Sequence, residues 1–158
     1  AILLLGMGLR ACTIAIQRPS GFFHGPPGAL QFSINPYSDL AQFCLFILLG
    51  LGSLTRPLAH KRFMLLASMV LAHPAIARLP YPLLPPALLP ANYPPGDVAV
   101  ILLLLPLLWH DLRSLRQLHW STWVGLGVIG SVILLRPPFS ATSIWLDWAV
   151  CLSALFPG

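Results

Sequence analysis

Charged residues are scarce in this sequence, and glutamate does not occur at all. Asp, Lys and Arg together make up 8% of the 158 residues, whereas a soluble domain carries roughly a quarter. Apolar residues account for 57% of the chain, and its mean hydropathy is +0.82. We therefore exclude a water-soluble globule and predict an integral membrane protein, whose first partner is the lipid bilayer.

The few charges are also unbalanced, because nine Lys or Arg stand against four Asp and give a net charge of +5. In a chain this apolar, an excess of basic residues indicates how loops are oriented across a membrane. It does not indicate nucleic-acid binding, so we expect no nucleic-acid partner.

Sequence motifs of hydrolytic enzymes are missing, since the chain has no HExxH, no GxSxG and no phosphate-binding loop. The three cysteines, Cys12, Cys44 and Cys151, lie in apolar runs without CxxC spacing. We expect them to form neither a disulfide framework nor a metal site. No Ala-x-Ala cleavage signature follows the first apolar run, so we expect no signal peptide. A hydrolytic enzyme is not expected, and the sequence requires no cofactor.

Six apolar windows approach the roughly 17 to 25 residues that one membrane-spanning helix needs. They cover residues 1–17, 36–55, 60–79, 96–112, 120–135 and 141–156. The last window is the least secure, because it is short and contains Asp147. We therefore predict one all-α domain over residues 1–158, a polytopic integral membrane bundle of five or six transmembrane helices.

The basic residues predict the orientation of this bundle, because Lys and Arg are retained in short cytoplasmic loops. Alternating helices put Arg56, Lys61, Arg62, Arg113 and Arg116 on one face, and Arg18, Arg78 and Arg136 on the other. We expect the loops after helices two and four to be cytoplasmic and the protein to lie in the bacterial inner membrane. Trp109 and Trp120 then mark the cytoplasmic interface.

Proline is concentrated in the apolar segment 79–96, which cannot form a regular helix or a central strand. We interpret this segment as an external strap that either lies on the membrane surface or packs against another protein. The residues expected to contact a partner are Pro82, Pro85, Pro86, Pro90 and Tyr93.

Gly125, Gly127 and Gly130 match the GxGxxG dinucleotide-binding pattern letter for letter. That pattern needs a strand before it and a helix that opens at it. These glycines instead lie in the middle of an apolar window, where small residues allow close contact between helices. We predict helix packing and no nucleotide site.

Ionisable groups inside a bilayer are costly, roughly 2.5 to 3.5 kcal/mol at the helix centre. Arg10, His73 and Asp147 lie at a similar depth in their windows, so we predict one intramembrane polar layer. In this hypothesis Arg10 pairs with Asp147, and His73 joins them or binds a cofactor. The alternative is a pair that only neutralises itself and fixes the bundle. A weak, exposed outer-rim network is expected from Asp39, Arg78, Asp97 and Arg136.

The histidines decide whether a cofactor site is plausible. His73 has no second histidine at its depth, so it fits a bis-histidine haem poorly. It is a core histidine, one axial ligand of a chlorophyll-type pigment, or a group that takes part in proton or quinone chemistry. His60, His110 and His119 are expected to converge with Asp111 near the cytoplasmic interface. They are the better candidate ligands for haem b, and the alternative is that they anchor helix ends.

The run RPLAHKRFMLLA at residues 56–67, followed by AIARLP at 75–80, resembles a family of uncharacterised bacterial multi-pass membrane proteins. Members carry a similar Arg-Pro-x-x-His-Lys-Arg-Leu-Met-Leu-Leu-Ala helix that closes with an Ala-Arg-hydrophobic-Pro step. The likeness spans roughly residues 35 to 140. The resemblance implies a multi-pass membrane scaffold and brings no known activity with it.

Three functions are compatible with this sequence. The first is a non-catalytic accessory subunit of a larger energy-converting membrane complex, photosynthetic or respiratory, with other membrane subunits as partners. The second is a haem- or quinone-binding redox protein that uses the interfacial histidines. The third is transport of protons or a small solute through the predicted polar layer, which so few polar lining residues support poorly.

Overall fold

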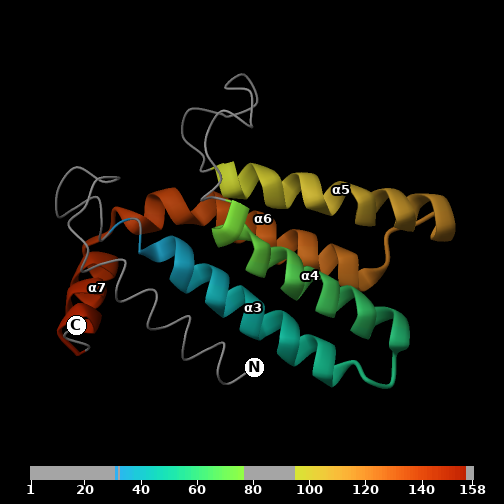
Figure 1. Ribbon diagram of the computed structural model, residues 1–158, viewed down its shortest axis with the longest axis horizontal. Coiled ribbons are helices and arrows are strands. Elements are labelled where there is room, and N and C mark those ends of the chain that lie inside the picture. The colour runs from blue at the N-terminus through green and yellow to red at the C-terminus, as the bar shows by residue number, and fades with distance from the viewer. Residues whose placement is uncertain (1–30, 32, 77–94, 156–158) are drawn as a thin grey trace. The chain divides into compact units, whose positions relative to one another are not determined.

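The computed structural model describes residues 31, 33–76 and 95–155 (Figure 1). Within these ranges the protein is all-α, with five helices and no strand. The helices are α3 (Ile34–Gly52), α4 (Pro57–Ile76), α5 (Pro95–Leu115), α6 (Trp120–Ser140) and α7 (Ser143–Leu155). The predicted helix at 1–17 and the predicted strap at 79–96 lie almost entirely outside the described residues.

The helix boundaries differ from the predicted windows chiefly at prolines. Pro57 and Pro95 are the first residues of α4 and α5, where a proline suits the helix because its missing N–H needs no partner. Helix α6 continues through Pro137 and Pro138 to Ser140, five residues beyond the predicted end at 135. The fixed φ of proline is compatible with a helix, so the last turn continues although it lacks two N–H donors.

The chain divides into two compact units, the first formed by Ala1–Leu40 and Ser131–Gly158 and the second by Ala41–Gly130. Helices α3 and α6 each contribute to both units. In the second unit α4 and α5 run antiparallel and pack along their length (Figure 1). The core of α4 is a stripe at helical spacing made of Ala59, Phe63, Leu66, Ala67 and Val70.

Helix α6 approaches this stripe closely at Gly125. A Cβ atom built on Gly125 would lie 2.9 Å from Cδ2 of Leu66 and closer still to its Cδ1. By contrast, a Cβ atom on Gly127 or Gly130 would meet nothing within 4 Å. The predicted packing role of this glycine motif is therefore confirmed at Gly125, and the other two glycines have no such neighbour among the described residues.

In the first unit, the short helix α7 packs on the start of α3. Trp145 and Ala149 are buried against Ile34, and the Tyr37 ring lies edge-on to the rings of Trp145 and Trp148. The Thr142 hydroxyl accepts the Trp145 N–H at 3.4 Å and so caps the first turn of α7. Helix α7 has 13 residues, which span about 20 Å at 1.5 Å per residue and fall short of the ~30 Å bilayer core.

Many large apolar side chains are exposed on the outer faces of the described helices, whereas several charged side chains are buried where these helices meet. Leu48, Leu134 and Ile144 are 66%, 65% and 73% exposed. Among the five described helices, only α3 and α6 are long and apolar enough to cross a membrane by length and composition. This supports membrane association, whereas the bundle of five or six spans stays a prediction.

Candidate functional site

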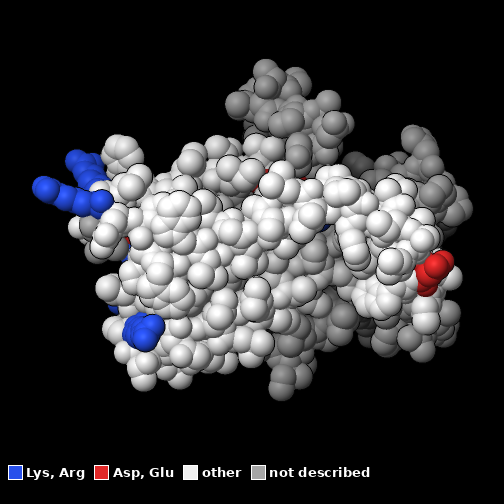
Figure 2. Space-filling view, turned by 180° about the vertical axis from the view of Figure 1, so that it is seen from behind, with Lys and Arg blue, Asp and Glu red and all other residues white. Residues whose placement is uncertain are grey.

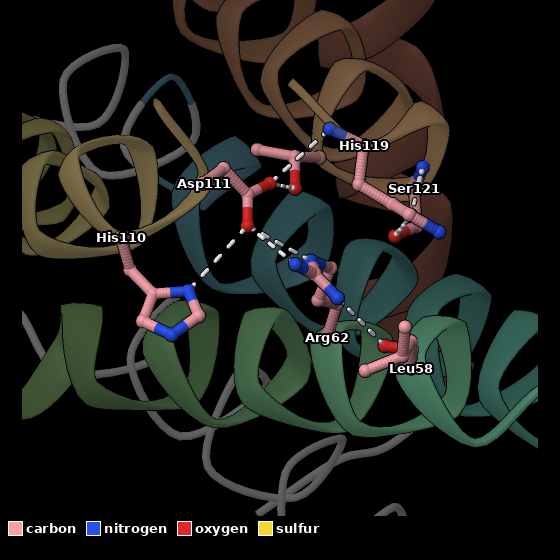
Figure 3. Close-up of polar contacts among 7 residues, drawn as sticks. Leu58, Arg62, His110, Asp111, His119 and Ser121 are labelled. Atoms are coloured by element: carbon pink, nitrogen blue, oxygen red, sulfur yellow. Dashed lines mark hydrogen bonds and ion pairs between the residues drawn. The ribbon is translucent and has the colours of Figure 1, made fainter. Parts of the chain in front are cut away.

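A buried ion pair joins α4 to α5 at the end of the second unit where α4 begins (Figure 3). Two guanidinium nitrogens of Arg62 donate to the same oxygen, Oδ1 of Asp111, from Nη2 at 2.5 Å and from Nε at 3.2 Å. A third nitrogen, Nη1, donates to the carbonyl of Leu58 at 3.3 Å. The Asp111 side chain is completely buried and that of Arg62 is 8% exposed, so solvent screens this pair little.

The second carboxylate oxygen of Asp111 binds the start of α6. The Thr122 hydroxyl donates to Oδ2 at 2.6 Å, and the His119 backbone N–H donates to it at 3.3 Å. A carboxylate offers about four acceptor positions, and here four donors occupy them. We call Arg62, Asp111, His119 and Thr122 the Asp111 clamp, because these four residues hold α4, α5 and the start of α6 together.

His119 completes the clamp as the residue that caps α6. Its carbonyl accepts the N–H groups of Thr122 and Trp123, and its ring Nδ1 lies 2.7 Å from the Ser121 hydroxyl. Nδ1 also accepts the Ser121 backbone N–H at 3.3 Å, so the ring proton belongs on Nε2. The negative Asp111 carboxylate beside this helix N-terminus is favoured by the helix dipole.

Acid is expected to weaken the clamp through His119. Burial and the nearby Arg62 charge lower the pKa of His119 below its usual 6.5, although Asp111 opposes them. Because the pKa of His119 is lower in the folded protein than in the unfolded chain, the unfolded imidazole is protonated first as the pH falls. The stability that neutral His119 contributes is therefore lost as the pH falls below about 6.5. The variant His119→Asn keeps a capping oxygen and lacks this titration.

We therefore expect the melting temperature of the detergent-solubilised protein to fall less for His119→Asn than for the wild type between pH 7 and pH 5. The comparison cancels the other histidines, which both proteins share. Parallel pH curves for the two proteins would contradict the capping role.

A second buried pair closes the opposite end of the α4 and α5 hairpin. Nε2 of His73, in the last turn of α4, lies 3.1 Å from Oδ1 of Asp97 in the first turn of α5. Both side chains are at least 95% buried, with exposures of 5% and 4%. The prediction put His73 in a layer with Arg10 and Asp147, whereas its described neighbour is Asp97.

The predicted pairing of Arg10 with Asp147 stays a prediction, because Arg10 lies outside the described residues. Asp147 itself is exposed on α7. The partner residues Pro82, Pro85, Pro86, Pro90 and Tyr93 of the predicted strap also lie outside the described residues, as does Arg78.

Two residues of the predicted outer-rim network, Asp39 and Arg136, lie in contact in the first unit. A terminal nitrogen of Arg136 on α6 donates to Asp39 on α3, and its Nε donates to the Ser38 hydroxyl at 2.8 Å. The expectation that this network is exposed is wrong, because Asp39 and Arg136 are only 7% and 6% exposed. Helix α6 continues past its predicted end and carries Arg136 inward, so the pair is a buried contact and not a weak surface one.

The three candidate haem ligands each have a separate neighbour. Nδ1 of His60 lies 2.8 Å from the Gly50 carbonyl, His119 caps α6, and His110 is 68% exposed with Nδ1 at 3.7 Å from Asp111. Within the described ranges no group of three or more His, Cys, Asp or Glu side chains is arranged to hold a metal ion. Haem or pigment binding by His60, His110, His119 or His73 therefore stays a prediction.

Sequence reasoning missed the clamp because it counted Arg62 as a loop cation and took Asp111 as a companion of the histidines. One feature of the sequence does indicate that these residues meet. Arg62 and Asp111 lie near adjoining ends of two antiparallel windows, at matching depth, and Thr122 follows at the start of the next window.

Comparisons with known proteins add no assignment, because no family model, curated protein or solved structure matches the chain. The resemblance to the multi-pass bacterial family stays a prediction that rests on the quoted residues.

Proposed function

We propose that this chain is a multi-pass inner-membrane protein that serves as a non-catalytic accessory subunit of a larger energy-converting complex, photosynthetic or respiratory. In this proposal the bundle has the five or six membrane spans predicted from the sequence. The loops after the second and fourth spans face the cytoplasm. Other membrane subunits are its partners.

The observation that carries the membrane part of the proposal is the inverted distribution of polar and apolar groups. Arg62, Asp111, His73 and Asp97 are all buried, whereas the outward faces of the same two helices present leucines. Charges paired in the interior with leucines outside are expected of a bundle in lipid, because hydrocarbon solvates no ion. The charged residues lower the mean hydropathy of α4 and α5. The buried ones are nevertheless paired with one another, Arg62 with Asp111 and His73 with Asp97.

The saturation of Asp111 supports a scaffold role. A carboxylate that already accepts four hydrogen bonds must break one of them before it takes a proton from a substrate. Its geometry instead fixes the ends of three helices, which gives a rigid surface to neighbouring subunits. We assign the Asp111 clamp to positioning and not to proton transfer.

The experiment is a gentle digitonin extraction from the native membrane, followed by native electrophoresis, mass analysis and an absorption spectrum of the band. We expect a band well above the 17.2 kDa of the chain that contains other membrane subunits in fixed ratio. A harsher detergent should release the isolated chain without a haem band.

A monomeric protein with stoichiometric haem would overturn this proposal and support the redox alternative. In that case His60→Ala, which removes the ring now held at the Gly50 carbonyl, should abolish the haem band. The exposed Ser68→Ala substitution, also on α4, is the matched control and should leave the spectrum unchanged.

A further inference from the structure

We infer that the end of α5 binds the headgroup of an anionic phospholipid, with Arg113, His110 and Ser114 on the phosphate and Trp109 at the glycerol level. This inference rests on the proposed membrane insertion and goes beyond it, because it names one lipid class and one site. The site is a shallow groove of about 310 Å³ lined by Trp109, His110, Arg113 and Ser114.

The surface of the groove itself is mostly apolar, and three of the residues that line it carry polar groups that suit a phosphate ester. Arg113 offers a forked cation, His110 a ring N–H and Ser114 a hydroxyl, and all three residues are exposed. The guanidinium carbon of Arg113 lies 5.7 Å from the centre of the Trp109 ring, so the ring orients the cation before any ligand arrives.

Charge at this end of the second unit has one sign. The exposed ionised side chains near it are Arg56, Lys61, Arg113 and Arg116. Both carboxylates of the second unit, Asp97 and Asp111, are buried at 3% and 0% exposure. Figure 2 shows exposed Lys and Arg gathered at the end where α5 finishes, with an uncharged surface beside them. An anionic headgroup complements this charge.

The apolar surface that leads to the groove suits an acyl chain. Ile101, Leu105, Trp109 and Arg113 follow one another at a spacing of four, so they form one exposed strip along α5. The strip runs about 18 Å from Ile101 to Arg113 at 1.5 Å per residue. Its side chains change from apolar to aromatic to cationic along this length. The length is close to the thickness of one leaflet, which is half of the ~30 Å hydrocarbon core. A free phosphate would leave the apolar part of this strip unused, so we commit to a lipid.

The test is native mass spectrometry of the full chain in non-ionic detergent, titrated with phosphatidylglycerol or with phosphatidylcholine. We expect the wild type to prefer phosphatidylglycerol, and Arg113→Gln to bind it about tenfold more weakly, as loss of one charge-assisted hydrogen bond implies. Lys61→Gln removes the same charge from the same end of the unit outside the groove and should change binding no more than about twofold. Equal melting temperatures of the two variants verify that both are folded.

Three results would overturn the lipid site. They are equal binding of the two lipids, equal losses in the two variants, and full displacement of phosphatidylglycerol by millimolar inorganic phosphate. Extraction of membranes with alkaline carbonate tests the proposed function separately. A protein that alkaline carbonate releases is not inserted in the membrane, and the proposed function then fails. An inserted protein without lipid preference would contradict only this inference.

Discussion

Replacing Asp111 by asparagine is expected to lower the free energy of unfolding by about 3–5 kcal/mol, the largest loss that we expect from a single polar substitution in this chain. The substitution leaves the Arg62 guanidinium buried without its counter-charge, while the amide oxygen still accepts from the start of α6. Thermal unfolding of the detergent-solubilised protein, followed by tryptophan fluorescence, measures the loss.

The control for this prediction is Arg113→Gln, which removes an exposed charge two residues further along α5 and should change stability by no more than about 1 kcal/mol. A double variant, Arg62→Met with Asp111→Leu, sharpens the test because it removes both charges together. It should be more stable than either single variant, since no buried charge remains unpaired. Equal losses for Asp111→Asn and Arg113→Gln would contradict the clamp.

Substituting Gly125 by leucine is expected to lower the free energy of unfolding by about 1–3 kcal/mol, because the new side chain must occupy the position of Leu66. Leu66 is fully buried, so it has little space into which it can move. The same substitution at Gly127 adds an identical side chain to the same helix at a position with open space. Gly127→Leu should therefore be neutral or stabilising, since it removes a helical glycine.

Thermal unfolding of the two glycine variants, measured side by side, tests this close contact between α4 and α6. Adding Leu66→Ala to each variant then shows whether steric conflict is the cause. The truncation should cost less in the Gly125→Leu protein than in the Gly127→Leu protein, because it makes room only at the first position. Equal stabilities of Gly125→Leu and Gly127→Leu would contradict the predicted helix contact.

The helices were predictable from the sequence to within a few residues, because long apolar runs interrupted by basic turns allow few other arrangements. The apolar window at 96–112 is helix α5 over Pro95–Leu115, and the window at 36–55 is α3 over Ile34–Gly52. The end of α6 was missed because the Pro137 and Pro138 pair is usually read as a helix stop, whereas here a buried ion pair holds the helix in place just before it.

The polar contacts were less predictable, because depth along a helix is readable from sequence and direction around it is not. His73 and Asp97 were assigned to different layers, yet the antiparallel packing of α4 on α5 brings them to 3.1 Å. Asp39 and Arg136 were assigned to one network and do meet, although no pattern in the chain indicated that they are buried.

Thiol labelling in spheroplasts tests directly whether the bundle crosses the membrane with the Asp111 clamp at its cytoplasmic end, as we propose. The native cysteines are replaced by serine, and one new cysteine is placed by Gln117→Cys between α5 and α6 or by Ala141→Cys between α6 and α7. Both positions are exposed, so a membrane-impermeant maleimide can reach each one wherever the membrane permits. We predict labelling at position 141 in intact spheroplasts and at position 117 only after permeabilisation. Labelling of both positions from the same side would contradict the proposed topology, because α6 would then not cross the membrane.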